Sequence, residues 1–213
     1  MRFGKNMLPV YAVTDRTWLD GRTLIEVTEQ AIAGGATCIQ LREKELDKES
    51  FLQEAVTLKA LCESYRIPFI VNDDVDIAVR CKADGVHIGQ HDMEAAKVRE
   101  IIGPDMILGV SAQTVEQALK AERDGADYLG VGSIFSTGTK ADADDVSLSE
   151  LKAICEAVSI PVVAIGGISL DNIVELKGTG IDGVAVVSAI YAAEDPKAAT
   201  VRLLERVRKE ILS

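Results

Sequence analysis

Short apolar runs recur along the chain and alternate with longer segments of mixed character. The runs are rich in Val and Ile and too short for helices, which is typical of buried strands in parallel sheets. They predict eight strands, at Pro9–Val13, Cys38–Leu41, Pro68–Val71, Gly85–Ile88, Ile107–Val110, Tyr128–Val131, Pro161–Ile165 and Gly183–Val187.

The segments between the runs carry apolar residues at helical spacing, which predicts amphipathic helices. The clearest faces are Leu24, Val27, Thr28 and Ala31; Phe51, Ala55, Leu58 and Cys62; and Val201, Leu204 and Val207. An apolar stripe of this kind faces the core of a globular protein.

The residues that precede the runs form a repeat of their own. Odd-numbered runs tend to begin at a proline, as at Pro9, Pro68 and Pro161, where no central ladder hydrogen bond is lost. Even-numbered runs follow small-residue turns: Gly34-Gly35-Ala36, Ala83-Asp84-Gly85, Gly125-Ala126-Asp127 and Gly180-Ile181-Asp182. A glycine in such a turn suits a helix C-cap in the left-handed region.

Alternating strands and helices predict right-handed crossovers and a parallel sheet. Eight such units in 213 residues favour an α/β fold, a (β/α)8 TIM barrel formed as a single domain by residues 1–213. The alternative is a doubly wound open sheet, but no G-x-G-x-x-G follows the first run to support it.

Composition excludes several classes of partner. A net charge of −11 disfavours binding to nucleic acid or to an anionic membrane, and no apolar run approaches the ~18–20 residues that span a bilayer. The four cysteines have no metal-binding spacing and are expected to be buried thiols in a reducing compartment. We therefore expect a cytoplasmic protein, a monomer or small homo-oligomer, that acts on small molecules.

A barrel of this kind places its chemistry at the C-terminal ends of the strands. The second run ends there in Gln40-Leu41-Arg42-Glu43-Lys44, and strand alternation puts Gln40, Arg42 and Lys44 on one side and Glu43 on the other. Three donors on one side fit an anionic ligand such as a diphosphate. The alternative is a solvated loop whose charges pair with each other.

Two carboxylates, Asp73 and Asp92, follow the third and fourth runs. If they converge, a cation must lie between them, and hard oxygen ligands beside phosphate-binding cations predict Mg²⁺. The alternative for either is a helix N-cap, which Asp74 could equally provide. The histidines, His87 and His91, offer a weaker case for a metal ligand or a general base, because the chain has no third ligand near them.

A second anion site is predicted beyond the sixth, seventh and eighth runs. The connection from Ser133 to Asp145 is built from Gly, Ser, Thr, Lys and Asp, as a lid would be, and Thr137, Thr139 and Lys140 could hold a phosphate. Gly166-Gly167 and Ser188 occupy the usual phosphate position of such barrels, although a glycine pair is also a tight turn. Two anion sites of different kinds indicate two phosphorylated substrates. Metal-assisted departure of pyrophosphate needs no nucleophile, and none stands out.

These segments together resemble the thiamine-phosphate synthase family. The resemblance runs nearly end to end and is carried by Tyr11–Asp15, Gln40–Lys44, Val71–Asp76, Ala83–Gln90, Ile107–Ala112, Gly125–Ile134, Thr139-Lys140, Asp142-Ala143, Ile160–Ile168 and Asp182–Ile190. It implies the (β/α)8 barrel and a reaction that joins 4-amino-5-hydroxymethyl-2-methylpyrimidine diphosphate to a thiazole phosphate. The products are thiamine phosphate and pyrophosphate, and the pyrimidine is understood to ionise first.

The resemblance also implies a role for each matched position. The pyrimidine diphosphate would be bound by Gln40, Leu41, Arg42, Glu43, Lys44, Asn72, Ser111 and Lys140, with Arg42, Lys44, Ser111 and Lys140 as the catalytic residues. Mg²⁺ would be bound by Asp73 and Asp92. The thiazole phosphate would be held by Thr137, Gly138, Thr139, Gly167, Val187 and Ser188.

Three positions depart from the family pattern. Gln113 stands where His is usual, and Ser133 and Ser136 stand where the loop usually carries prolines, a change that costs loop rigidity but no charge. Two alternatives share the barrel: a thiazole tautomerase, or a non-catalytic sensor of a thiamine precursor. The tautomerase is disfavoured because Gln113 cannot titrate and because it would need no diphosphate or Mg²⁺ set.

Overall fold

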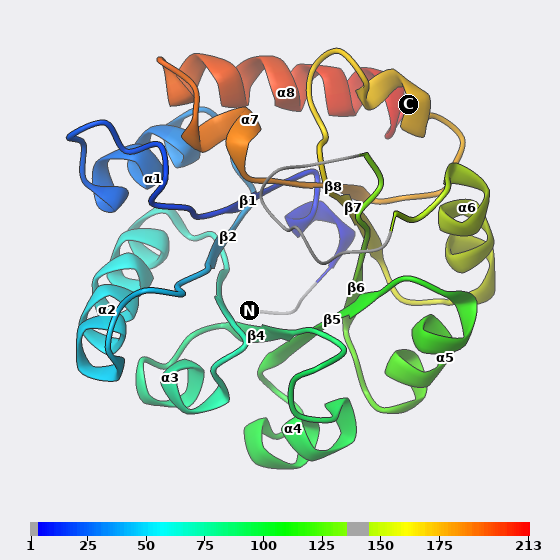
Figure 1. Ribbon diagram of the computed structural model, residues 1–213, viewed down its shortest axis with the longest axis horizontal. Coiled ribbons are helices and arrows are strands. Elements are labelled where there is room, and N and C mark those ends of the chain that lie inside the picture. The colour runs from blue at the N-terminus through cyan, green and yellow to red at the C-terminus, as the bar shows by residue number, and fades with distance from the viewer. Residues whose placement is uncertain (1–3, 136–144) are drawn as a thin grey trace.

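Eight parallel strands close into a barrel in chain order, as the sequence predicted (Figure 1). The computed structural model describes residues 4–135 and 145–213. Its strands are β1 (Val10–Val13), β2 (Cys38–Leu41), β3 (Phe69–Asn72), β4 (Gly85–Ile88), β5 (Ile107–Ala112), β6 (Tyr128–Val131), β7 (Val162–Ile165) and β8 (Gly183–Val186). Pairing of β8 with β1 completes the ring and leaves no open sheet edge.

Helices form an outer layer around this ring of strands (Figure 1). They are α1 (Leu24–Ala33), α2 (Lys48–Tyr65), α3 (Val75–Arg80), α4 (Ala95–Ile102), α5 (Val115–Arg123), α6 (Leu148–Ala157), α7 (Ser188–Tyr191) and α8 (Pro196–Glu210), with 3-10 turns η1 (Lys5–Met7) and η2 (Ile173–Leu176). Most of the longer helices begin where a side-chain oxygen accepts a first-turn N–H. These caps are Thr23, Asp47, Asp74, Thr114, Ser147 and Asp195.

The predicted strand boundaries were wrong by one or two residues at some ends. Pro9, Pro68 and Pro161 each lie one residue before a strand, because proline has no N–H for the ladder. Their carbonyls still contribute, since they accept hydrogen bonds from Val184, Ile39 and Leu129 of the neighbouring strands. At the other end, β3 extends to Asn72 and β5 to Ala112, whereas β8 stops at Val186.

Two of the three predicted helix faces are buried as expected, on α1 and α2. The face predicted for α8 was wrong in part, because Val201 is 39% exposed and Leu204 is only half-buried. The buried residues of α8 are Pro196, Ala199, Thr200, Leu203 and Val207, and Thr200 lies where α8 approaches the turn after α1. A side chain at Gly34 would lie 2.7 Å from the Thr200 Cβ atom, so the two helices meet through small residues.

The core has two parts, one inside the barrel and one between the strands and the helices. The inner part contains Leu8, Tyr11, Val13, Cys38, Ile70, Ile107, Tyr128, Val163 and Ala185. The outer part is larger and aliphatic, as the composition predicts. All four cysteines are free thiols; Cys38, Cys62 and Cys81 are buried as predicted, whereas the prediction was wrong for Cys155, which is half-buried.

The turns before the even-numbered strands repeat around the barrel. In each, one residue adopts a left-handed backbone: Gly35 (φ 102°), Lys82 (φ 54°), Gly125 (φ 93°) and Gly180 (φ 91°). The prediction of a left-handed glycine was therefore wrong in the second turn, where Lys82 takes that conformation. Gly85 serves there as a strand residue, and a Cβ atom on it would meet Ile107 at 2.6 Å.

One polar residue stands directly before each even-numbered strand and ties it to the preceding strand. The backbone N–H of Asp127 donates to the Leu108 carbonyl at 2.7 Å, and its carboxylate accepts the Leu108 N–H at 2.7 Å. The same reciprocal pair joins Asp84 to Phe69, Asp182 to Val162, and Thr37 to Val10. We call Thr37, Asp84, Asp127 and Asp182 the base residues, because they lie at the N-terminal end of the strands.

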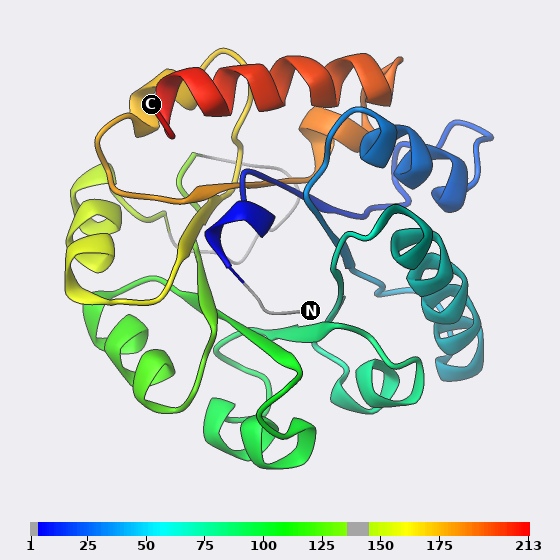
Figure 2. The same ribbon diagram turned by 180° about the vertical axis from the view of Figure 1, so that it is seen from behind.

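Each carboxylate among the base residues also has a cation. Lys59 contacts Asp84 at 3.0 Å, Arg99 contacts Asp127 at 2.6 Å, and Lys5 contacts Asp182 at 2.8 Å. Lys5 belongs to η1, which lies across the centre of this end of the ring (Figure 2). The N-terminal end of the barrel is therefore closed and electrostatically balanced.

Within residues 4–135 and 145–213, no helix combines the length and apolar character needed to cross a membrane.

Candidate functional site at the barrel mouth

The C-terminal ends of the strands form what we call the mouth of the barrel. Polar side chains gather there at the ends of β1 to β5, as the sequence predicted from the barrel geometry. A cleft of about 290 Å³ opens beside β1 and β2. It is lined by Asp15, Arg16, Thr17, Trp18, Arg42, Glu43, Lys44 and Glu45.

Gln40 lies near the end of β2 and Arg42 directly follows it, both on the side of the barrel interior and mouth. The Gln40 side-chain Nε2 donates to the Tyr11 hydroxyl at 2.8 Å, inside the ring. The backbone of Arg42 is fixed by Thr14, whose Oγ1 accepts the Arg42 N–H at 3.0 Å. The guanidinium lies 3.6 Å from the Asp15 carboxylate, and its buried Nε has no hydrogen-bond partner among the described residues. Arg42 therefore keeps donor capacity for a ligand.

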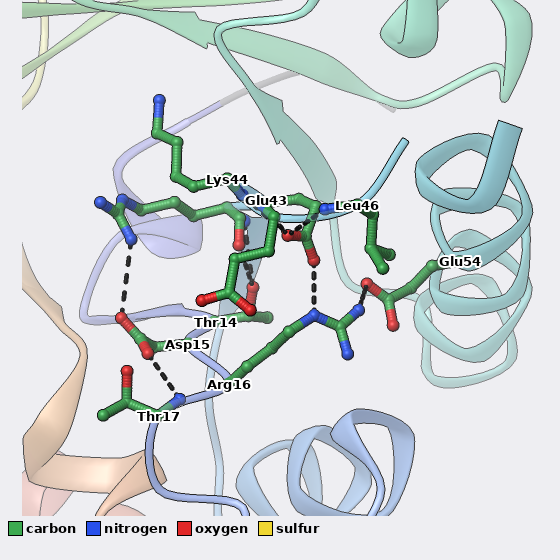
Figure 3. A network of polar contacts seen from close by, with 10 residues as sticks. Thr14, Asp15, Arg16, Thr17, Glu43, Lys44, Leu46 and Glu54 are labelled. Atoms are coloured by element: carbon green, nitrogen blue, oxygen red, sulfur yellow. Dashed lines mark hydrogen bonds and ion pairs between the residues drawn. The ribbon is translucent and has the colours of Figure 1, made fainter. Parts of the chain in front are cut away.

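Glu43 points away from the mouth and lies within a cluster that we call the Glu43 clamp: Arg16, Glu43 and Glu54 (Figure 3). Arg16 Nε donates to the Glu43 carboxylate at 2.6 Å and its Nη2 donates to Glu54. The other Glu43 oxygen accepts the backbone N–H groups of Lys44, Glu45 and Leu46 at 2.8, 2.7 and 3.2 Å. One carboxylate, only 2% exposed, therefore fixes the turn that presents Arg42 and Lys44.

The electrostatics of the clamp follow from these contacts. Burial opposes the charged forms of both partners, but their mutual hydrogen bonds prevail. The pKa of Glu43 is lowered below its ordinary 4.5 by Arg16 and by the backbone donors. The pKa of Arg16 is raised by Glu43 and Glu54. Both groups therefore stay ionised at neutral pH.

A larger, more open hollow of about 580 Å³ lies on the outer side of the clamp, towards α2.

Asp73 and Asp92 converge at the mouth, and neither caps a helix. Asp74 caps α3 instead, accepting the Ile77 N–H at 2.9 Å, while Asp73 adopts a left-handed backbone with φ 64°. The Asp73 carboxylate contacts Lys44 Nζ at 2.5 Å. The Asp92 carboxylate accepts the Gly89 N–H at 2.6 Å. Burial raises the pKa of Asp92, and the neighbouring negative charge of Asp73 raises it further.

This carboxylate pair has the chemistry of a cation site. Two hard oxygen donors whose charges disfavour each other are relieved by a divalent cation between them. No group of three or more His, Cys, Asp or Glu side chains suited to a metal is found among residues 4–135 and 145–213. A pair without a third protein ligand suits Mg²⁺, which keeps waters and shares substrate phosphates, better than it suits zinc.

Ser111, near the end of β5, is linked to Gln40 through the interior of the barrel. Its hydroxyl lies 3.0 Å from Nε2 of His87, whose Nδ1 lies 3.0 Å from the Tyr128 hydroxyl. Tyr128 and Tyr11 share a hydrogen bond of 2.7 Å, and Tyr11 contacts Gln40. His87 thus points into the barrel and not at the carboxylate pair, whereas His91 is exposed.

Two further turns complete the described part of the mouth. Gly166 and Gly167 follow β7 with left-handed φ angles of 106° and 60°, and the Asn172 amide donates to the Gly167 carbonyl at 2.9 Å. Val187 and Ser188 lie where β8 passes into α7. The predicted residues Ser136, Thr137, Gly138, Thr139 and Lys140 lie outside the described residues.

The departures at Gln113 and Ser133 have local contacts. The backbone N–H of Gln113 donates to the Gln117 side chain at 2.8 Å. Ser133 is buried, follows a cis peptide bond, and donates from its hydroxyl to the Phe135 carbonyl at 3.0 Å.

Several residues of the mouth were not predicted from the sequence. Arg16 and Glu54 are remote from Glu43 along the chain, so no local pattern could pair them. The inward direction of the interior polar residues could have been predicted, because side-chain alternation along β4 and β6 places His87 and Tyr128 inward.

Comparisons with known proteins place this geometry in context. A model of the thiamine monophosphate synthase family matches residues 10–190. A thiamine-phosphate synthase of Ruminiclostridium cellulolyticum is 54% identical over 196 residues, which cover 92% of this chain and 93% of the relative. The corresponding protein of Clostridium tetani is 55% identical over 190 residues, covering 89% and 91%. A solved thiamine phosphate pyrophosphorylase of Pyrococcus furiosus superposes with a TM-score of 0.90 at 42% identity, covering 97% of this chain and 98% of its own.

Proposed function

The chain belongs to the thiamine monophosphate synthase family, and we propose that it joins a pyrimidine diphosphate to a thiazole phosphate. The carbon–oxygen bond to the diphosphate breaks, a carbon–nitrogen bond to the thiazole forms, and pyrophosphate leaves. A cationic pair, Arg42 and Lys44, beside a carboxylate pair, Asp73 and Asp92, is the observation that carries this proposal. Such a mouth fits a Mg²⁺–diphosphate leaving group.

Arg42 and Lys44 would stabilise the negative charge that develops on the leaving pyrophosphate. Among the described residues, the Arg42 guanidinium has one carboxylate, Asp15, at 3.6 Å, and its buried Nε has no hydrogen-bond partner, so it is prepared for a second anion. Lys44 is paired with Asp73 in the free protein and would exchange that contact for phosphate oxygens. Ser111, Gln40 and Asn72 would orient the pyrimidine diphosphate, and Lys140 would add a further charge.

Asp73 and Asp92 would hold Mg²⁺. The bound ion would supply positive charge to the diphosphate oxygens. The carboxylates would hold the ion beside Arg42, so that both the ion and the guanidinium would neutralise the negative charge of the leaving pyrophosphate.

The thiazole phosphate would lie on the opposite side of the mouth, at Gly167, Val187 and Ser188 together with Thr137, Gly138 and Thr139. Gly166 and Gly167 have left-handed backbones and no side chains that would block a phosphate. Holding the second substrate there would bring its nitrogen towards the carbon whose bond to the diphosphate breaks.

Leu41 and Glu43 would support the site without contacting the ligand through their side chains. Leu41 is fully buried in the layer between the barrel and the helices. Glu43 is occupied by Arg16 and three backbone N–H groups. We assign Glu43 a positioning role, because its carboxylate fixes the turn that carries Arg42 and Lys44.

The test is a direct assay of the purified chain with both phosphorylated substrates and Mg²⁺. Formation of thiamine phosphate and of an equal amount of pyrophosphate is expected. Absence of both products with substrates that a known synthase converts would refute the proposal. A Mg²⁺-independent conversion of the thiazole phosphate alone would identify a tautomerase, and binding without turnover would identify a sensor.

A further inference from the structure

Five side chains form a continuous hydrogen-bonded chain through the interior of the barrel, from β2 to β5. We call Gln40, Tyr11, Tyr128, His87 and Ser111, in this order, the interior chain. Its successive contacts measure 2.8, 2.7, 3.0 and 3.0 Å. All but Ser111 are buried. Its two ends are the residues placed above at the diphosphate.

Two glycines make the room for the interior chain. A Cβ atom at Gly109 would lie 2.2 Å from the Tyr128 ring and 2.5 Å from His87 Nδ1. A Cβ atom at Gly130 would lie 3.0 Å from His87 Cε1. Both glycines face the interior on strands next to His87 or Ser111. The imidazole is therefore held by neighbours on several strands.

The direction of the hydrogen bonds can be followed from the Gln40 end. The amide Nε2 can only donate, so the Tyr11 hydroxyl accepts there and its own hydrogen is available for Tyr128. The Cys38 thiol beside Tyr11 is a weaker acceptor than a hydroxyl oxygen. Tyr128 can then donate to His87 Nδ1, which leaves the ring hydrogen on Nε2, facing the Ser111 oxygen.

We propose that the interior chain runs in this one direction, fixes His87 as the Nε2–H tautomer, and leaves the Ser111 hydroxyl hydrogen free to donate into the mouth. Tyr11, Tyr128 and His87 are thus positioning residues that act through Ser111. The ligand named here, a diphosphate, rests on the proposed function. The tautomer does not.

Burial raises the pKa of both Tyr11 and Tyr128 well above the usual range, so each hydroxyl keeps its hydrogen. The direction itself is set at the Gln40 end, where the amide Nε2 donates to Tyr11. In the reverse direction, Ser111 would donate to His87 and could offer only lone pairs to the mouth. Lone pairs turned towards an anion repel it, so the proposed direction is also the one that suits the diphosphate of the proposed function.

Nuclear magnetic resonance of the imidazole nitrogens tests the direction in the ligand-free protein. The chain has only two histidines, and His91→Asn identifies the signals of His87. We expect long-range ¹⁵N–¹H correlations of His87 to show a protonated Nε2 and an unprotonated Nδ1. A protonated Nδ1, two protonated nitrogens, or averaging between tautomers, as expected for exposed His91, would overturn the proposal.

Two matched variants test the consequence for binding. Tyr128→Phe removes the hydroxyl that donates to His87, and Tyr191→Phe removes a hydroxyl that is equally buried but bonds to Thr28 on the outer side of the barrel. We expect Tyr128→Phe to lose the tautomer preference and to bind Mg²⁺–pyrophosphate roughly tenfold more weakly, about the value of one hydrogen bond to a charged group. Tyr191→Phe should change neither property.

Wild-type tautomer and affinity in Tyr128→Phe would refute the relay, and so would an equal loss of affinity in Tyr191→Phe. The outcomes remain separable from those of the enzyme assay. A wrong tautomer leaves the synthase proposal standing, and an inactive protein with the expected tautomer leaves the interior chain standing.

Discussion

The two ends of the barrel hold similar charged residues in different settings. At the N-terminal end, each base carboxylate accepts a backbone N–H and contacts a cation, as Asp127 does with Leu108 and Arg99. At the mouth, Asp92 lies beside another carboxylate, and Arg42 has a buried Nε without a described partner. The first end is balanced within the protein, whereas the second is left to be completed by a ligand.

Stabilising charges and functional charges can thus be separated within a single fold by the partners they have. A charge whose partners all belong to the protein lowers the free energy of the folded state, so its removal is felt in unfolding. A charge that lies beside a like charge, or that keeps a buried donor without a partner, is held at a cost that binding relieves. Variants at the two ends should therefore fail in different assays.

The largest effect is expected for Arg42→Ala. Because leaving-group charge goes unneutralised, kcat/KM should fall roughly 10²–10³-fold in the synthase assay. The urea unfolding curve should be nearly unchanged, since among the described residues the guanidinium makes a single ion pair, with Asp15 at 3.6 Å. Arg208→Ala, in the exposed last turn of α8, is the control. A loss below about threefold for Arg42→Ala would contradict its assigned role.

Asp127→Ala should show the reverse pattern. It leaves the buried Leu108 N–H without its acceptor and Arg99 without its carboxylate, so the free energy of unfolding should fall by about 2 kcal/mol. Asp127→Asn keeps an acceptor oxygen and should lose less. Activity per folded molecule should be that of the wild type for both. Equal urea midpoints for all three proteins would remove Asp127 from the base residues that stabilise the barrel.

Glu43→Gln tests the Glu43 clamp, which connects α2 to the turn after β2. The turn after β2 loses its ionic contact with Arg16, and we expect kcat/KM to fall roughly tenfold through misplacement of Arg42 and Lys44. Glu54→Gln, at the far end of the clamp, should have a smaller effect. If Glu54→Gln is the more damaging of the two, the clamp does not act through Glu43.

The clamp also predicts a pH dependence of stability. The folded-state pKa of Glu43 is lowered, so its contribution is complete above the unfolded value of 4.5 and is lost as pH falls through the lowered value. The difference in unfolding free energy between wild type and Glu43→Gln should therefore shrink below about pH 4.5. A constant difference across this range would show that Glu43 is not ionised in the folded protein.

The smallest change in stability is expected at the mouth itself. Asp92→Asn removes a charge that repels Asp73, so the ligand-free protein should be as stable as wild type or more stable, by less than about 1 kcal/mol. The same variant should also have a lower kcat/KM, because the Mg²⁺ site loses a charged ligand. Clear destabilisation without Mg²⁺ would show that Asp92 belongs with the balanced charges.

Much of this architecture could be predicted from the sequence because its signals are local. The eight apolar runs and the turns before the even-numbered strands gave the barrel. Strand alternation placed Gln40 inward and Glu43 away from the mouth. Asp73 and Asp92 converge because the carboxyl ends of neighbouring parallel strands meet at one edge.

What the sequence could not give depends on contacts between distant segments. Arg16 and Glu54 come from different elements, and only the closed ring brings both to Glu43. The inward face of α8 was missed because the small turn at Gly34, far along the chain, selects Thr200 over Val201. The interior chain likewise depends on Gly109 and Gly130, whose lack of side chains matters only after the strands pair.

The central claim is that the mouth binds a metal ion together with a diphosphate. It can be tested by calorimetric titration of pyrophosphate, with and without Mg²⁺, into the wild-type protein and into a double Asp73→Asn, Asp92→Asn variant. We expect wild-type binding to tighten strongly when Mg²⁺ is present. The double variant should bind pyrophosphate through Arg42 and Lys44 with little response to Mg²⁺. Equal Mg²⁺ dependence in the two proteins, or none in the wild type, would contradict the assignment of the carboxylate pair.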